Sequence, residues 1–143
     1  MSSPFDYRQV DKSAWEFTTE EGVLYWATFA DASRYFVNYP EFSSKVRTFH
    51  FKVLENPLPH IPHNPRVGAT IISLILQFFN EDPEGILFFI HEAADGKERG
   101  RKKKFDAWFG KVTDAAVLKR DAEIPVGRFA ILVSILVRMD HPL

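Results

Sequence analysis

The sequence contains no cysteine, which excludes disulfide bonds, thiolate metal sites and cysteine nucleophiles together. It also lacks an excess of charge of either sign, because 18 basic and 19 acidic residues leave a formal net charge of −1. A generally basic surface for nucleic acid is therefore excluded, and such binding would need a local patch. The longest apolar runs, Ile86–Ile90 and Phe129–Val137, are far shorter than the roughly 20 residues that a membrane helix requires.

Motifs that would name a chemistry are lacking as well. There is no glycine-rich phosphate-binding loop and no nucleophile elbow. His60 and His63 lie in a proline-rich loop with His50 as a third candidate, and loop histidines without further ligands seldom form a metal site. We therefore expect no metal and no cofactor, and the sequence favours a binding module over an enzyme.

The N-terminal residues give an expectation about location. Residues 1–8 lack the basic stretch followed by an apolar run that marks a signal peptide. Absence of cysteine is compatible with a reducing compartment. We expect a cytoplasmic protein that does not contact a membrane.

The sequence is rich in aromatic side chains. Aromatic residues make up 15% of the 143 residues, and 14 of them are phenylalanine. This composition predicts a ring-packed core, and the length fits one domain over residues 1–143.

Periodicity predicts the elements of this domain. Residues 56–65 contain four prolines and form a stiff connection, after which Asn64 caps a buried helix that has Pro65 in its first position and ends near Asn80. A second helix runs from Lys97 to Val112, and a short one is possible over 31–36. Strands are predicted at 14–19, 23–29, 47–53, 86–90, 117–124 and 129–137.

The element order predicts an α+β fold. It consists of a twisted, mostly antiparallel sheet of five or six strands with two helices packed on one face. The continuous apolar run Ile86–Ile90 is typical of a central strand covered on both faces. The helices on either side of this strand could make a local parallel pairing, in which case the sheet is mixed.

The segment Ile86–Phe109 resembles a family of short uncharacterised bacterial proteins. In that family an apolar strand leads into an acidic turn with Asp-Gly, and a basic helix follows that closes with a Phe–Trp–Phe cluster. The matching residues here are Asp95, Gly96, Arg101, Phe105, Trp108 and Phe109. The family's strand ends in Cys-Asp where this sequence has His91-Glu92, which argues against a thiol role. The resemblance implies a fold and no activity.

One place in this fold is suited to a site. At about 100° per residue, the face of the second helix that carries Phe105 and Trp108 begins with charged residues. This charged end follows the terminus of the central strand, where ligands often bind in open sheets. The candidate ligand-binding residues are His91, Glu92, Asp95, Glu98 and Arg101.

A purely structural explanation of the same residues stays open. Glu98 and Arg101 could form a local ion pair, Asp95 could cap the helix, and His91 could simply end a strand. An acid–base enzyme using His91 with a nearby carboxylate is a further alternative. Adjacent strand residues point to opposite faces, which separates His91 from Glu92.

A basic run supplies the remaining hypothesis, which is binding to nucleic acid or nucleotide phosphate. Positive charge is unfavourable at a helix N-terminus, which hints that the basic run has a functional use. Most such runs, however, only form a solvated helix face. The leading interpretation remains a module that binds through the polar end of the helix, with a protein partner or a homodimer possible. The candidate phosphate-binding residues are Lys97, Arg99, Lys102, Lys103 and Lys104.

Overall fold

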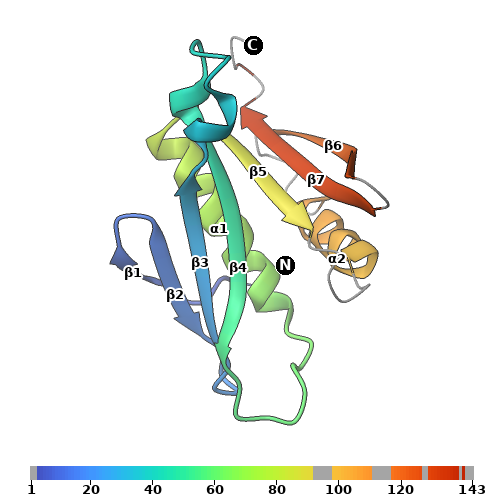
Figure 1. The fold of residues 1–143 in the computed structure, drawn as a ribbon. Helices are drawn as coiled ribbons and strands as arrows, with labels where there is room; N and C mark the ends of the chain where they lie inside the picture. Colours follow the sequence, from blue (N-terminus) through green and yellow to red (C-terminus); the bar gives the residue numbers. More distant parts are fainter. Residues whose placement is uncertain (1–2, 92–97, 111–116, 127–128, 139, 141–143) are drawn as a thin grey trace.

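The computed structural model describes residues 3–91, 98–110, 117–126, 129–138 and 140, and within these ranges it forms an α+β fold (Figure 1). The helices are α1 (Pro65–Glu81) and α2 (Glu98–Gly110), with two short 3-10 turns, η1 (Ser33–Phe36) and η2 (Ser43–Lys45). The strands are β1 (Arg8–Asp11), β2 (Ala14–Thr18), β3 (Leu24–Asp31), β4 (Val46–Glu55), β5 (Ile86–His91), β6 (Val117–Val126) and β7 (Phe129–Arg138).

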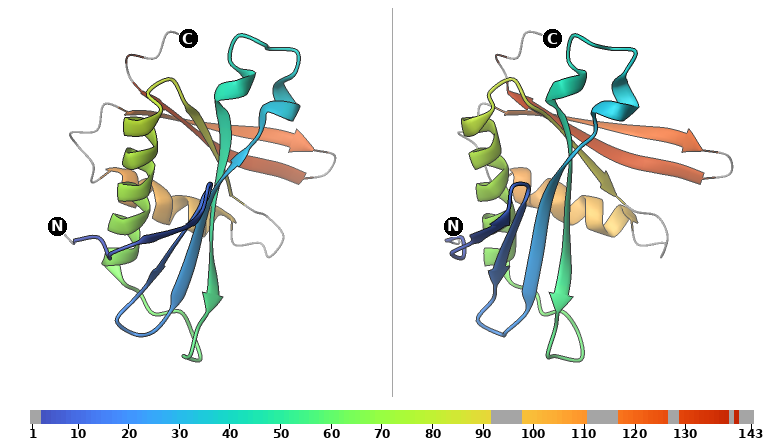
Figure 2. Two further views of the ribbon diagram at one scale, coloured as in Figure 1. Left: turned by 90° about the vertical axis from the view of Figure 1, so that its left-hand side faces the viewer. Right: turned by 60° about the vertical axis from the view of Figure 1, so that its left-hand side comes forward.

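The strands form one mixed sheet in the order β1-β2-β3-β4-β5-β7-β6. All neighbours are antiparallel except β4 and β5, which are parallel because α1 crosses between them. The possible parallel pairing next to Ile86–Ile90 is thereby confirmed. Figure 2 shows the sheet so strongly twisted that the β6–β7 hairpin turns steeply away from β1–β4.

The predicted number of five or six strands is wrong, because the described sheet has seven. The additional strand is β1, four residues whose side chains are all exposed. Its polar sequence has no apolar alternation, so nothing local marks it as a strand. It is held by pairing with β2, and a register shift lies between Gln9 and Asp11.

The first helix begins as predicted. The side chain of Asn64 accepts a hydrogen bond from the Arg66 N–H at 3.0 Å, and Pro65 occupies the first turn, where its missing N–H is harmless. The apolar face of α1 packs on the sheet. There the ring of Phe78 stacks on that of Phe29 in β3, with ring centroids 5.3 Å apart.

The second helix lies on the same face of the sheet. Phe105 is buried and stacks on Phe89 of β5, with ring centroids 4.4 Å apart and planes 13° apart. Phe89 in turn contacts Phe49, which is paired with Phe29 beneath α1. Figure 2 shows both helices on this one side, as the sequence predicted.

The opposite face of the sheet is covered only in part. Phe36 and Phe42, from the segment around η1 and η2, pack near Ile86 and Phe88 at the start of β5. Ile90, farther along the same face of β5, is 42% exposed. The expectation that this strand is covered on both faces is therefore wrong at its end, because the covering segment reaches only its beginning.

Candidate functional site

The candidate site is positioned by the aromatic contact between α2 and β5. The ring of Phe105 lies on Phe89. His91 comes two residues after Phe89 on β5, and its backbone is about 6.7 Å farther along the strand. Arg101 comes four residues, or about 6 Å, before Phe105 on the helix. The end of β5 and the first turn of α2 therefore both lie close to this contact, and six residues join them.

The candidate ligand-binding residues are described to different extents. His91, Glu98 and Arg101 have their backbone placed, at the end of β5 and in the first turn of α2. Glu92 and Asp95 lie outside the described residues. The structure thus brings one strand end and one helix end together, and convergence of the five side chains stays a prediction.

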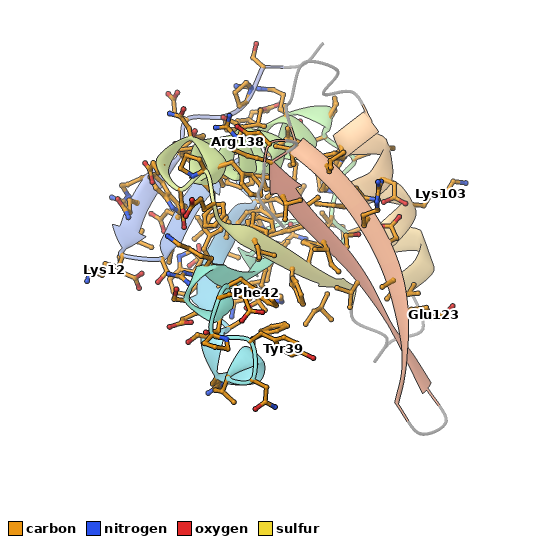
Figure 3. All side chains as sticks on the ribbon, turned by 90° about the horizontal axis from the view of Figure 1, so that it is seen from above. Lys12, Tyr39, Phe42, Lys103, Glu123 and Arg138 are labelled. Atoms are coloured by element: carbon orange, nitrogen blue, oxygen red, sulfur yellow. The ribbon has the colours of Figure 1, made fainter. Side chains whose placement is uncertain are left out.

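The basic run is described only at its end. Lys97 lies outside the described residues, and Arg99 and Lys102 have only their backbone placed. Lys103 and Lys104 are both exposed, and Figure 3 shows Lys103 projecting away from the body of the protein. The ammonium of Lys104 lies 5.6 Å from the ring centroid of Trp108, within the range of a cation–π contact.

The structure also reveals a polar cluster that the sequence reading missed. The ammonium of Lys119 on β6 lies 2.6 Å from Oδ1 of Asp106 on α2 and 2.8 Å from Oδ1 of Asp121. The hydroxyl of Ser134 on β7, which is fully buried, donates to Asp121 at 2.8 Å. The side chain of Lys119 is only 14% exposed.

This cluster ties α2 to the β6–β7 hairpin. Its chemistry is that of a tether, because the Ser134 hydroxyl donates to a carboxylate and Lys119 is held between two anions. One signal could have found it. Ser134 is the single polar residue in the run Phe129–Val137, and strand pairing places it opposite Asp121.

Two other surfaces expose apolar side chains. Tyr39, in the segment between η1 and η2, is 52% exposed and stacks on Phe42, and Figure 3 shows both residues at this end of the molecule. In the proline-rich loop, Leu58 and Ile61 are exposed. His60 and His63 are exposed in the same loop, and no group of three or more potential metal ligands occurs among the residues whose positions are described.

The length and hydropathy of the described helices bear on membrane insertion. None of these helices is both long and apolar enough to cross a bilayer. This agrees with the short apolar runs of the sequence.

Comparison with known proteins gives a family and no activity. Residues 63–142, which run from the N-cap region of α1 through β7, match a family described as "Family of unknown function (DUF6169)". The chain belongs to this family. The expectation of an uncharacterised family is thereby confirmed, and the matched range contains the whole of Ile86–Phe109. No curated protein matches the chain.

Proposed function

We propose that this DUF6169 member is a small binding module whose ligand surface is formed by the end of β5 and the first turn of α2. The observation that supports it is the stacking of Phe105 on Phe89. This contact buries the aromatic end of α2 and leaves the charged end at the terminus of a central strand. The first turn of a helix also presents backbone N–H groups that have no partner within the helix.

The proposed ligand carries an anionic group. Arg101 supplies a planar guanidinium that suits carboxylate or phosphate, and the helix N-terminus favours negative charge. Lys103 and Lys104 are exposed in the next turn and add positive potential. Glu98 and Asp95 limit this potential, so the surface favours a small anionic group or an acidic segment of a partner protein over a polyanion.

The test is an NMR titration that follows backbone amide shifts at low ionic strength. The probes are inorganic phosphate, a short acidic peptide and a single-stranded oligonucleotide. We expect phosphate or the peptide to shift amides of residues 91 and 98–101, and Arg101→Glu to weaken this binding about tenfold or more, because a charge-assisted hydrogen bond is lost. Lys12→Glu is the matched control, since Lys12 lies at the β1–β2 turn far from α2 (Figure 3).

Each rival hypothesis has its own outcome in this experiment. Binding of the oligonucleotide alone, with a steep loss on adding salt and on reversing Lys103 and Lys104, would favour the nucleic-acid alternative. An acid–base role for His91 requires its imidazole to titrate together with a nearby carboxylate. If no probe shifts the amides of α2, or if Lys12→Glu has the same effect as Arg101→Glu, the proposal is wrong.

A further inference from the structure

The two edges of the sheet differ in a way that bears on assembly. One edge is β1, which has four residues and a register shift, both of which protect an edge from pairing with another chain. The other edge is β6, in which all ten residues pair with β7 without a register shift. No described strand pairs with the far side of β6. The outer side of β6 is therefore an edge of the described sheet, and Pro125, which has no backbone N–H, is the one residue in the strand that cannot donate a ladder hydrogen bond.

The charges along β6 are arranged symmetrically about Asp121. Lys119 and Glu123 lie two residues to either side of it, on the same face of the strand. When two copies of a strand pair antiparallel across a two-fold axis, residues equally distant from the axis face one another. With the axis at Asp121, Lys119 therefore faces Glu123 of the second copy, and this pair occurs twice.

The other face of β6 also fits this register. Here Arg120 faces Ala122 of the second copy, so its charge meets a small side chain. Opposite-charge pairs such as Lys119 with Glu123 stabilise a sheet, whereas directly opposed like charges destabilise it.

Neighbouring registers are less favourable. An axis at Arg120 also opposes Lys119 and Asp121, but it places Arg120 against itself on a strand face that carries no carboxylate, and an axis at Ala122 places Asp121 against Glu123 twice. The axis at Asp121 places only the two Asp121 side chains against each other. Each of these carboxylates already has a cation, because Lys119 lies 2.8 Å from it.

We propose that β6 pairs antiparallel with β6 of a second copy of this chain, with the two-fold axis at Asp121. The dimer joins two seven-stranded sheets into one continuous sheet and leaves only the protected β1 strands at its ends. The dimer contact is made by β6, which β7 separates from β5 in the sheet. It therefore does not depend on the proposed ligand surface at the end of β5, and either proposal can fail alone.

The first test uses charges at Ala122, whose side chain is partly exposed and carries no polar group that a substitution would remove. Ala122→Glu places a carboxylate opposite Arg120 of the second copy twice. We therefore expect the dissociation constant of the dimer to fall about tenfold. Ala122→Lys should promote dissociation by a similar factor. Gln9→Glu and Gln9→Lys on β1 are the matched controls and should leave the equilibrium unchanged. Sedimentation equilibrium measures all four.

The second test uses the absence of cysteine from the chain. Asp121→Cys places a single thiol opposite its own copy, within the Cα separation that a disulfide spans, so mild oxidation should give a covalent dimer. Glu123→Cys faces Lys119 and should not crosslink alone, whereas Lys119→Cys with Glu123→Cys should. A monomer at every concentration, or Ala122→Glu and Ala122→Lys that behave alike, would overturn the proposal even if Asp121→Cys proved poorly folded.

Discussion

The indole of Trp108 on α2 lies directly on Gly68 of α1. A methyl group at position 68 would fall 2.4 Å from Cδ1 of Trp108, well inside any permitted contact. The close approach of the two helices therefore depends on a residue without a side chain. This close approach places Trp108 between α1 and Phe51 of β4, and the ring centroid of Phe51 is 5.9 Å from that of the indole.

Gly68→Ala should destabilise the protein. Alanine favours a helix by about 1 kcal/mol over glycine, but forced overpacking in a core costs about 1–3 kcal/mol, and an overlap of this depth belongs at the upper end. We expect a lower free energy of unfolding in urea denaturation. Gly110→Ala is the matched control, because a methyl group there meets no atom within 4 Å. Equal effects of the two substitutions would show that α2 does not pack on α1 in this way.

The tether between α2 and β6 gives a second prediction. Asp106→Asn removes the carboxylate that lies 2.6 Å from the largely buried Lys119 ammonium. We expect a loss of about 1–3 kcal/mol, the range for leaving a buried polar group short of a partner. Asp140→Asn is the control, because Asp140 is 71% exposed and its pair with Arg138 should contribute little.

The readout should separate a local from a global effect. Because the tether joins one helix to one hairpin, hydrogen exchange in Asp106→Asn should accelerate in α2 and β6 before it does so in α1. Uniform acceleration across the sheet would contradict a role confined to α2. No change in either region would remove the tether as a stabilising element.

Much of the fold could be predicted because its signals are local. Asn64 and Pro65 mark a helix start by their own chemistry, and Phe105 and Trp108 mark a buried helix face by their spacing. β1 could not be predicted in the same way, because a polar strand of four residues becomes a strand only through its neighbour.

The candidate site shows the same limit. The sequence predicted that the end of β5 and the start of α2 lie together, since six residues join them. It could not place Lys119 beside Asp106, because that contact depends on the register of β6 on β7 and on how α2 crosses the hairpin. Contacts between distant elements are set by packing, which no local pattern records.

Tyr25 on β3 predicts how stability changes at alkaline pH. Burial, with a smaller contribution from the charge of Glu21, raises the pKa of the Tyr25 phenol above its ordinary value of 10.0. The folded state therefore keeps this proton to a higher pH than the unfolded state does. The contribution is complete below about pH 10 and is lost as the pH rises through the raised folded value.

We therefore expect the free energy of unfolding to fall between pH 9 and pH 11 by more in the parent protein than in Tyr25→Phe. Denaturant titrations at the two values measure this difference. Tyr39→Phe, which removes a phenol that is exposed, is the control. A parent and a Tyr25→Phe variant with identical slopes would contradict a burial effect at this phenol.

Asn64 joins the start of α1 to the β2–β3 turn. Its side-chain oxygen accepts the Arg66 N–H, and its amide nitrogen donates to Glu20 at 3.1 Å and to Glu21 at 3.0 Å. Asn64→Ala removes both functions and should cost about 1–2 kcal/mol, near the upper end for an N-cap, because the residue is buried. Asn56→Ala is the control, since Asn56 makes a similar local bond to the Leu58 N–H in an exposed loop.

Asn64→Asp separates the cap from the link to the turn. The aspartate keeps an acceptor for the Arg66 N–H and adds a negative charge that favours a helix N-terminus. It also replaces a donor by a carboxylate that faces Glu20 and Glu21, and like charges at such short range repel. If the link to the turn contributes, Asn64→Asp should be destabilised at pH 7 and should recover as the pH falls toward 4. A variant as stable as the parent at pH 7 would assign the whole effect of Asn64 to the cap.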